Sequence, residues 1–524
     1  MESDSKNNET TRNKQVPSGL LEPIVRQILS ARVYDVAVET PLNEAPLLST
    51  RQCNRVLLKR EDVQPVFSFK CRGAYNKIAN LPDETLQCGI ITASAGNHAQ
   101  GVALAANRLG IRAVIVMPQT TPSIKVQAVQ AYGVEVVLHG DTFELARAHA
   151  LKLMQEQALT YIPPYDDEAV IAGQGTVAME VLRQCTGRID AVFVPCGGGG
   201  LIAGMAAYIK YVRPDIRVIG VEPQDAACLS AALLAGERVI LPEVGLFAEG
   251  VAVAQIGEIP FQYAQHTVDE VITVTEDELC AGVKDIFEDT RAISEPSGAL
   301  ALAGLKQYVD REKCTGRNFV AVVSGANTNF DRLRYISERT QFGEHREALF
   351  AATIPEQPGS FLAFCEMLGK RSITEFNYRF ADEHTAHVFV GLALSDTRRE
   401  LPPLLKNLTE KGYPVTDFSD DELTKLHIRH MVGGHALRVS HELIYRFIFP
   451  ERPGALLTFL QRLSDRWNIS LFHYRNHGAA FGRVLVGFQA SDNEKTVLNA
   501  VLDSLGYHYV EESNNEAYRL FLGA

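Results

Sequence analysis

The sequence predicts an α/β protein in which a large domain with mainly parallel sheet structure precedes two copies of a smaller α+β unit. Between about residue 89 and residue 336, short runs rich in Ile and Val alternate with longer helical patterns, as in parallel sheets covered by helices. Beyond residue 345, the segment "IPEQPGSFLAF" at 354–364 returns as "FPERPGALLTF" at 449–459, identical at six of eleven positions. We therefore expect a duplicated domain behind the large one.

The elements follow one another in a clear order. Residues 1–19 are polar and aperiodic and are predicted to form a flexible tail, and a helical pattern follows over 20–37. A capping box, Thr275 with Glu278, opens a helix at 276–287. Strands are expected at 89–94, 111–118, 134–140, 216–223 and 271–274, and 190–212 and 318–336 each begin with a strand. The expected domains are 20–336, 345–430 and 440–524.

The composition limits the possible partners. A formal net charge of −12 and a pI near 5.7 argue against nucleic acid or an anionic membrane as the main ligand. The nine cysteines form no C-x-x-C pair and are typical of reduced intracellular thiols, so no metal site is expected. The chain has no long apolar run and no apolar signal core at its start. We expect a cytoplasmic protein that acts on small molecules.

Lys70 lies in "VFSFKCRGAYNKI", where an apolar strand pattern changes to a helical one. One interpretation is a surface lysine whose stem covers apolar neighbours. The other is a desolvated amine with a lowered pKa, which can condense with a carbonyl group. Phe69 and Cys71 beside it are interpreted as packing residues. The segment alone does not decide between the two interpretations of Lys70.

Four consecutive glycines, Gly197 to Gly200, connect a strand to a helix in "VFVPCGGGGLIAG", where backbone N–H groups and the helix dipole favour a phosphate. A nucleoside triphosphate is excluded, because Met205 and Ala206 stand where such a loop needs Lys and then Ser or Thr. The spacing Gly198-x-Gly200-x-x-Ala203, with Glu222 near the end of the next strand, where a ribose-binding acid would stand, does fit a dinucleotide site. A nicotinamide-dependent dehydrogenase therefore remains an alternative.

Two further turns offer polar groups at strand ends. In "TASAGNHAQG", Ser94, Ala95, Gly96 and Asn97 precede a helix and suit a carboxylate, although they could also only cap that helix. In "VVSGANTNF", Ser324 ends a strand at the edge of the sheet, where ligands of open α/β folds gather. Pyridoxal 5′-phosphate would use a lysine, a phosphate loop, a group at its pyridine nitrogen and a carboxylate site together.

The motifs "SFKCRGA", "SAGNHAQG", "PCGGGGL", "EPSGA" at 295–299 and "SGAN" resemble the tryptophan-synthase-like family of pyridoxal enzymes, fold type II. Within it, they resemble the biosynthetic threonine deaminases, and the later segments "SITEFNYRFAD", "HMVGGH" and "WNISLFHYRNHG" resemble the regulatory domain of those enzymes. The resemblance covers almost the whole chain from about residue 20. It implies a catalytic domain with two open, mainly parallel sheets, followed by two ACT-like subdomains.

The resemblance also implies residue roles. Lys70 forms the resting Schiff base with the cofactor and later takes the α-proton as general base. Asn97 binds the phenolic oxygen of the cofactor, and Ser324 meets its pyridine nitrogen. A hydroxyl there leaves the ring closer to neutral than a carboxylate would, which favours elimination. The cofactor phosphate is assigned to Gly197, Gly198, Gly199, Gly200 and Leu201, and the substrate carboxylate to Ser94, Ala95, Gly96 and Asn97.

The implied reaction converts L-threonine to 2-oxobutanoate and ammonia, the first step of isoleucine biosynthesis, with L-serine as a second substrate. The implied regulation is inhibition by isoleucine and relief by valine in a homotetramer. Four aromatic residues on equivalent strand patterns are candidates for an effector pocket, although an aromatic core also explains them: Phe376, Tyr378, Phe472 and Tyr474. The duplicated units could also serve only as an oligomer interface, and the chain could be a non-catalytic amino-acid sensor.

Overall fold

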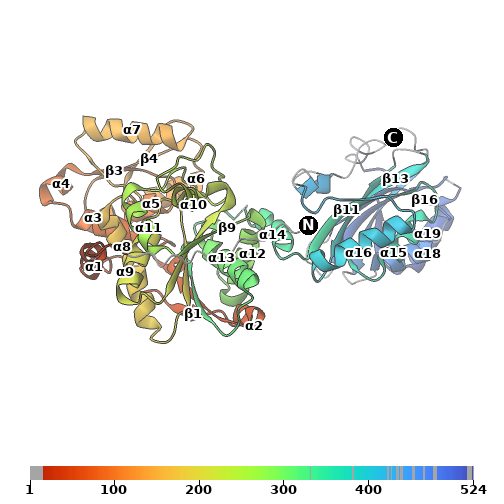
Figure 1. Cartoon of the computed structure of the whole chain (residues 1–524). Coiled ribbons are helices and arrows are strands. Elements are labelled where there is room, and N and C mark those ends of the chain that lie inside the picture. The colour runs from red at the N-terminus through yellow and green to blue at the C-terminus, as the bar shows by residue number, and fades with distance from the viewer. Residues whose placement is uncertain are drawn as a thin grey trace. The chain divides into compact units, whose positions relative to one another are not determined.

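The computed structural model shows two compact units, one ending at Thr340 and the other beginning at Gln341 (Figure 1). It describes residues 16–524, apart from residues 331, 381–382, 422–423, 426–427, 432–435, 437–438, 440, 451–454, 464–465, 476–480, 492, 516–517, 519–521 and 523–524. Most of the expected tail, residues 1–15, therefore lies outside the described residues.

The first unit contains a six-stranded sheet in the order β1-β2-β10-β7-β8-β9, in which only β1 is antiparallel to its neighbour. Both faces of this sheet are buried. On β7, Phe193 packs on the side of α13, whereas its neighbour Val192 packs on the side of α9. This burial explains why the strands are apolar at consecutive positions. The strands are β1 Leu42–Glu44, β2 Arg55–Arg60, β7 Ala191–Pro195, β8 Arg217–Pro223, β9 Glu270–Val274 and β10 Asn318–Val323.

The helices around this sheet are α1 Leu21–Leu29, α2 Pro46–Gln52, α8 Glu168–Gln184, α9 Gly200–Val212, α10 Cys228–Ala235, α11 Glu258–Thr267, α12 Glu276–Thr290, α13 Pro296–Glu312 and α14 Arg332–Gly343. The capping box of α12 is confirmed, since Thr275 Oγ1 accepts the Glu278 N–H and the Glu278 carboxylate accepts the Thr275 N–H. The helix expected over 20–37 is wrong in length, because α1 ends at Leu29. After it, Val33 and Ala37 flank a turn at 34–36 and are buried against Val66 and Cys71 instead of continuing the helix.

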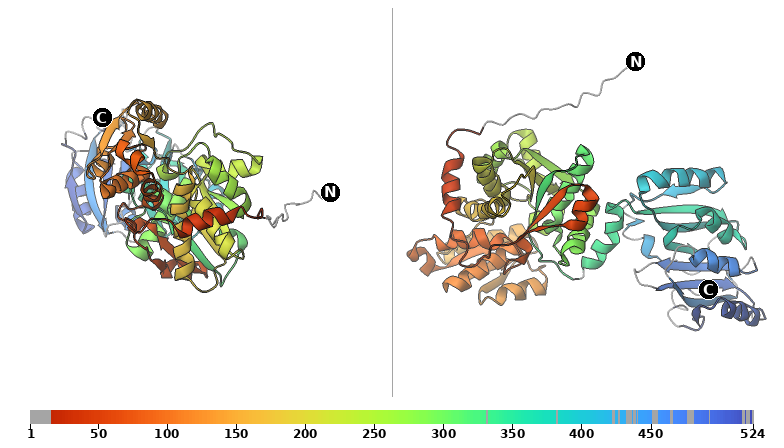
Figure 2. Two further views of the ribbon diagram at one scale, coloured as in Figure 1. Left: turned by 90° about the vertical axis from the view of Figure 1, so that its left-hand side faces the viewer. Right: turned by 90° about the horizontal axis from the view of Figure 1, so that it is seen from below.

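A second, smaller sheet of the same unit is parallel throughout, in the order β5-β4-β3-β6. Its strands are β3 Ile90–Ala93, β4 Ala113–Met117, β5 Glu135–Leu138 and β6 Thr160–Tyr161. Its helices, drawn in orange in Figure 2, are α3 Lys70–Ala79, α4 Asp83–Cys88, α5 Asn97–Leu109, α6 Ser123–Gln130 and α7 Phe143–Glu156. Helix α5 is followed by Gly110, which adopts a left-handed conformation and ends the helix.

The second unit repeats one βαββαβ motif. The first copy contains β11 Glu347–Pro355, α15 Ser360–Leu368, β12 Ser372–Arg379, β13 Thr385–Ala393, α16 Thr397–Glu410 and β14 Val415–Asp417. The second contains β15 Glu442–Pro450, α18 Ala455–Leu463, β16 Asn468–Arg475, β17 Phe481–Gln489, α19 Lys495–Ser504 and β18 His508–Glu511. Short 3-10 helices elsewhere in the chain are η1 Glu61–Val63, η2 Gln224–Ala226, η3 Glu249–Val251 and η4 Ile428–His430.

The two copies form one continuous sheet of eight strands, in the order β14-β11-β13-β12-β16-β17-β15-β18. The order is symmetric, because equivalent strands lie at equal distances from the β12–β16 pair. At that pair, Phe376 lies opposite Tyr474, and Tyr378 lies opposite Phe472. Helices α15, α16, α18 and α19 cover one face of the sheet (Figure 1). The fold class expected from the sequence is confirmed in both units.

No helix within the described ranges is long and apolar enough to cross a membrane.

Candidate active site

Lys70 is the first residue of α3, and the loop before it is held by the end of the large sheet. The Phe69 N–H donates to the Ser324 carbonyl oxygen at 3.2 Å, and the Ala326 N–H donates to the Phe67 carbonyl oxygen at 2.9 Å. The expected lysine and the expected strand-end serine, 254 positions apart in the chain, are thus joined through backbone hydrogen bonds. These bonds fix where α3 begins and therefore where Lys70 lies.

Burial lowers the pKa of the Lys70 amine to about 8, although the negative charge of Glu295 acts in the opposite direction. Lys70 Nζ donates to the Pro164 carbonyl oxygen at 3.2 Å and lies 5.4 Å from the centre of the Phe69 ring. Lys70 is therefore partly enclosed and has an amine that is easily deprotonated. These are the properties of a reactive lysine, not of a surface lysine with an apolar stem.

A buried ion cluster anchors α3 directly behind Lys70. The Arg72 guanidinium pairs with Glu61 at 2.8 Å and with Glu180 at 2.6 Å, and Lys59 Nζ pairs with Glu180 at 2.6 Å. All four side chains are fully buried, and their charges balance. Because each charge is paired and hydrogen-bonded, the cluster fixes the first turn of α3 without an unpaired buried charge.

The glycine loop lies between β7 and the N-terminus of α9, a helix of 13 residues. Gly199 has a φ of +90°, a left-handed conformation that favours glycine. A Cβ on Gly198 would lie 2.2 Å from the Tyr165 ring, so this position excludes any larger residue. Pro164, whose carbonyl oxygen accepts the Lys70 hydrogen bond, precedes Tyr165, whose ring packs against the glycine loop. Two consecutive residues therefore contact the lysine and the loop, which places the two close together.

The N–H groups of Gly197 to Leu201 donate to no protein acceptor in the part of the chain that the structure describes. Five free amide donors at a helix N-terminus form a cradle for a phosphate group. The loop therefore fits the phosphate of pyridoxal phosphate, because its five unpaired N–H groups can donate to the phosphate oxygens. Leu201 is buried in the first turn of α9 and contributes its backbone N–H to this cradle.

Ser94, Ala95 and Gly96 connect β3 to α5, and Asn97 is the first residue of that helix. Ser94 Oγ accepts the Gly96 N–H at 3.4 Å, and no described heavy atom lies within 4 Å of where a Gly96 Cβ would be. The turn thus presents a hydroxyl and a helix N-terminus to open space, an arrangement that suits a carboxylate. His98, the next residue, stays neutral, because burial and the Lys70 charge lower its pKa to about 3.

Asn97 is bound on both sides by residues from distant motifs. Its Nδ2 donates to Glu295 Oε1 at 2.6 Å, and its Oδ1 accepts from Asn327 Nδ2 at 2.7 Å. Burial raises the pKa of Glu295 to about 7. The sequence motifs "EPSGA" and "SGAN" contain these two residues, but the sequence alone indicates no role for either of them. Ser324 is buried at the end of β10, where its hydroxyl donates to the Ser297 carbonyl oxygen at 3.3 Å.

Glu222, which the dinucleotide alternative needs as a ribose-binding acid, has another function. Its two carboxylate oxygens accept the N–H groups of Leu229 and Ser230, each at 2.8 Å, in the first turn of α10. The side chain is fully buried, and burial raises its pKa to about 7. Because both oxygens are used within the protein, the structure disfavours a nicotinamide-binding role for the glycine loop.

The four effector candidates of the second unit lie in its hydrophobic core. Phe376 packs edge-on against Phe472 with ring centres 5.5 Å apart, and the Phe361 and Tyr378 rings are 4.9 Å apart. Burial and a hydrogen bond to Glu356 raise the pKa of Tyr378. All four rings are buried, and their contact with an effector stays a prediction: Phe376, Tyr378, Phe472 and Tyr474.

A lysine with a lowered pKa, a phosphate cradle and an asparagine held at a helix start, on two open parallel sheets, define a pyridoxal-phosphate-dependent enzyme of the tryptophan-synthase-like class. The family model "Pyridoxal-phosphate dependent enzyme" matches residues 33–325. The model "C-terminal regulatory domain of Threonine dehydratase" matches 338–428 and again 433–522.

Proteins of similar sequence and structure indicate which family within this class the chain resembles. The biosynthetic L-threonine dehydratase of Burkholderia multivorans is 55% identical over 501 residues, 95% of this chain and 99% of that one. The Escherichia coli enzyme of the same name is 54% identical over 498 residues, 95% of this chain and 96% of that one. The solved processed form of threonine deaminase isoform 2 from Solanum lycopersicum is 49% identical, with a TM-score of 0.61, and covers 62% of this chain and 95% of its own. The chain belongs to the biosynthetic threonine dehydratase family of pyridoxal-phosphate-dependent enzymes.

Proposed function

We propose that the protein converts L-threonine to 2-oxobutanoate and ammonia by eliminating water and that this is the first step of isoleucine biosynthesis. The observation that carries the proposal is the Lys70 amine. Its pKa is lowered to about 8, and it lies close to the phosphate cradle, since Pro164 contacts the amine and the next residue, Tyr165, contacts the cradle. The names of the relatives agree with this substrate.

Pyridoxal phosphate, when bound, supplies an electron sink for negative charge at the substrate α-carbon. Lys70 would bind its aldehyde carbon, the N–H groups of Gly197 to Leu201 its phosphate, Asn97 its phenolic oxygen and Ser324 its pyridine nitrogen. Ser94, Ala95, Gly96 and Asn97 would orient the substrate carboxylate. The Lys70 amine would take the α-proton, since a pKa near 8 leaves about a tenth of it neutral at pH 7, far more than for an exposed lysine. The β-hydroxyl would then leave as water, taking up a proton, and hydrolysis of the unsaturated amine that is released would give 2-oxobutanoate and ammonia.

Lys70→Ala tests this proposal. The variant should lose 2-oxobutanoate production from threonine, because it lacks both the covalent anchor and the base, while keeping the wild-type circular dichroism spectrum. Normal turnover in this variant would refute the role of Lys70. L-Serine should be a slower second substrate, because one methyl group discriminates by only roughly 10- to 200-fold.

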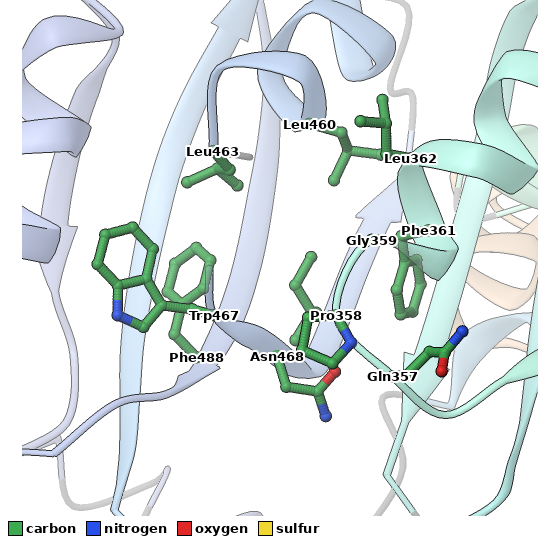
Figure 3. A pocket seen from close by; sticks show the side chains of 11 residues that line it. Gln357, Pro358, Gly359, Phe361, Leu362, Leu460, Leu463, Trp467, Asn468 and Phe488 are labelled. Atoms are coloured by element: carbon green, nitrogen blue, oxygen red, sulfur yellow. The ribbon is translucent and has the colours of Figure 1, made fainter. Parts of the chain in front are cut away.

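We further propose that the C-terminal unit binds isoleucine, which inhibits, and valine, which relieves inhibition, and that the enzyme is a homotetramer. The match of both copies to a regulatory domain supports this proposal. A small, open pocket lies between the two copies (Figure 3). Pro358 and Phe361 line it from the first copy, and Leu460 and Trp467 line it from the second. Its apolar walls suit a branched aliphatic side chain. The cytoplasmic location stays a prediction.

A further inference from the structure

Glu295 is a buried carboxyl, 7% exposed, whose role the proposed reaction leaves open. It precedes Pro296 at the start of α13 but makes no capping hydrogen bond to its own helix. Its backbone N–H donates to the Gly325 carbonyl oxygen at 3.1 Å, and a Cβ on Gly325 would lie 2.7 Å from Glu295 Oε1. The carboxyl is therefore packed against the "SGAN" turn, and it points away from its own helix toward Asn97.

The hydrogen bonds around Asn97 allow only one orientation of its amide. Asn327 Nδ2 donates to Val66 O at 2.8 Å and to Asn97 Oδ1 at 2.7 Å, so both of its protons are used. On the other side, Asn97 Nδ2 donates to Glu295 Oε1 at 2.6 Å. If the Asn97 amide turned by half a rotation, two NH₂ groups would face each other and its oxygen would face the Glu295 carboxyl.

One N–H of Asn97 remains after these bonds are counted, because an amide nitrogen carries two protons and one of them is directed to Glu295. The backbone N–H of Asn327 also acts favourably on the charged Glu295 carboxylate and limits the rise of its pKa. The carboxyl thus accepts a hydrogen bond from Asn97 and is stabilised by the segment that holds the other side of Asn97. Glu295 also interacts electrostatically with Lys70, since its negative charge favours the ammonium form of that amine.

We propose that Glu295 is a positioning residue, which holds the Asn97 amide so that its remaining N–H is directed at the phenolic oxygen of bound pyridoxal phosphate. This inference rests on the proposed function, because it assigns a partner to the residue that binds the cofactor. Asn327 completes the arrangement from the opposite side. Glu295 itself touches neither the substrate nor the cofactor in this account and acts through Asn97 and through its charge.

Glu295→Gln tests the proposal, because a glutamine keeps the size of the side chain, loses its charge and has one acceptor oxygen instead of two. We expect the Kd of pyridoxal phosphate, titrated into the apoprotein and followed by absorbance, to rise roughly 10- to 100-fold. The pH midpoint of the visible band of the bound cofactor should move down by about one unit, because the lost negative charge no longer favours a nearby cation.

Asp285→Asn is the matched control. Asp285 is also buried, and it pairs with Lys306 at 2.6 Å and with Arg51, whereas none of the hydrogen bonds or ion pairs found among the described residues joins it to a site residue. This variant should lose thermal stability while keeping the cofactor Kd and the pH midpoint of the wild type. The comparison of the two variants distinguishes the general effect of losing a buried carboxylate from a specific effect of Glu295 on cofactor binding.

The proposal is overturned if Glu295→Gln keeps the wild-type Kd and pH midpoint, or if Asp285→Asn changes both as strongly. Should Glu295→Gln fail to fold, Asn327→Ala removes the donor on the opposite side of Asn97 and leaves the carboxyl intact. This second variant should also weaken cofactor binding at least tenfold, and an unchanged Kd would equally overturn the proposal. If the wild-type protein itself binds no cofactor, the proposed function fails instead.

Discussion

Lys70 depends on its surroundings for its chemistry. An exposed lysine is almost fully charged at neutral pH, since its pKa is near 10.4. Burial at the start of α3 lowers the pKa of Lys70 to about 8, whereas the charge of Glu295 limits the shift. The amine is therefore neutral often enough to react and charged often enough to exchange protons. At the residue scale, the reactivity of Lys70 follows from two opposing effects on its pKa, burial and the charge of Glu295.

The rate of cofactor capture should report this pKa. Only a neutral amine condenses with an aldehyde, so the rate at which apoprotein takes up pyridoxal phosphate should rise with pH and level off above about 8. Stopped-flow absorbance from pH 6 to pH 10.5 measures this profile. A rate that keeps rising toward pH 10.5 would indicate an ordinary exposed lysine.

The sequence predicted some of these residues and not others for a physical reason. Lys70, Asn97, Ser324 and the glycines lie in short motifs whose residue types suit their chemistry. The role of Glu295 depends on a hydrogen bond to a residue 198 positions away, and no local pattern indicates such a pair. The same limit applies to Glu222, which fitted a ribose-binding spacing but caps α10.

At the scale of elements, the glycine loop combines a helix N-terminus with a tight fit against Tyr165. The run of four glycines predicted the loop from the sequence, because a plain turn rarely needs so many. The sequence could not show which neighbour requires them. The structure shows that Tyr165 occupies the space next to Gly198 and Gly200, and that Val251 does so next to Gly197.

Gly198→Ala should weaken binding of pyridoxal phosphate about ten- to hundredfold, because the new Cβ would lie 2.2 Å from the Tyr165 ring and overpacking costs about 1–3 kcal/mol. Gly187→Ala is the control, since no atom lies within 4 Å of its Cβ position. A titration of each apoprotein with cofactor measures the difference. Equal affinities in the two variants would contradict the proposed cradle.

The length of α1 shows where periodicity misleads. The apolar residues of 20–37 continue at helical spacing past Leu29, and this spacing predicted one long helix. In the structure, Val33 and Ala37 are buried in a separate small cluster with Cys71, next to Lys70. Tertiary packing around the site therefore outweighs the local pattern, and the segment packs against the loop before α3 instead of extending α1.

At the scale of the whole molecule, a catalytic unit is followed by a duplicated sheet. The sequence repeat predicted two copies, since their offset is constant, but it could not show which strands pair between them. The structure pairs β12 with β16, and the register is symmetric about the pair Asn377 and His473. The pocket between the copies exists only because of this pairing, and no single copy could form it.

Leu362→Trp should raise the isoleucine concentration for half inhibition at least tenfold, because the added bulk fills a pocket that Leu362 lines. Each variant is normalised to its own uninhibited rate. Leu405→Trp is the control, because Leu405 packs partly buried against the same core but does not line the pocket. If both variants respond to isoleucine as the wild type does, the effector binds elsewhere.

The most direct test of the central claim is the absorption spectrum of the purified protein before and after addition of L-threonine, with 2-oxobutanoate measured in the same sample. We expect a visible band from cofactor bound at Lys70, a change of that band on addition of threonine, and formation of the ketoacid. A protein that stays colourless with added pyridoxal phosphate, and forms no ketoacid, would contradict it.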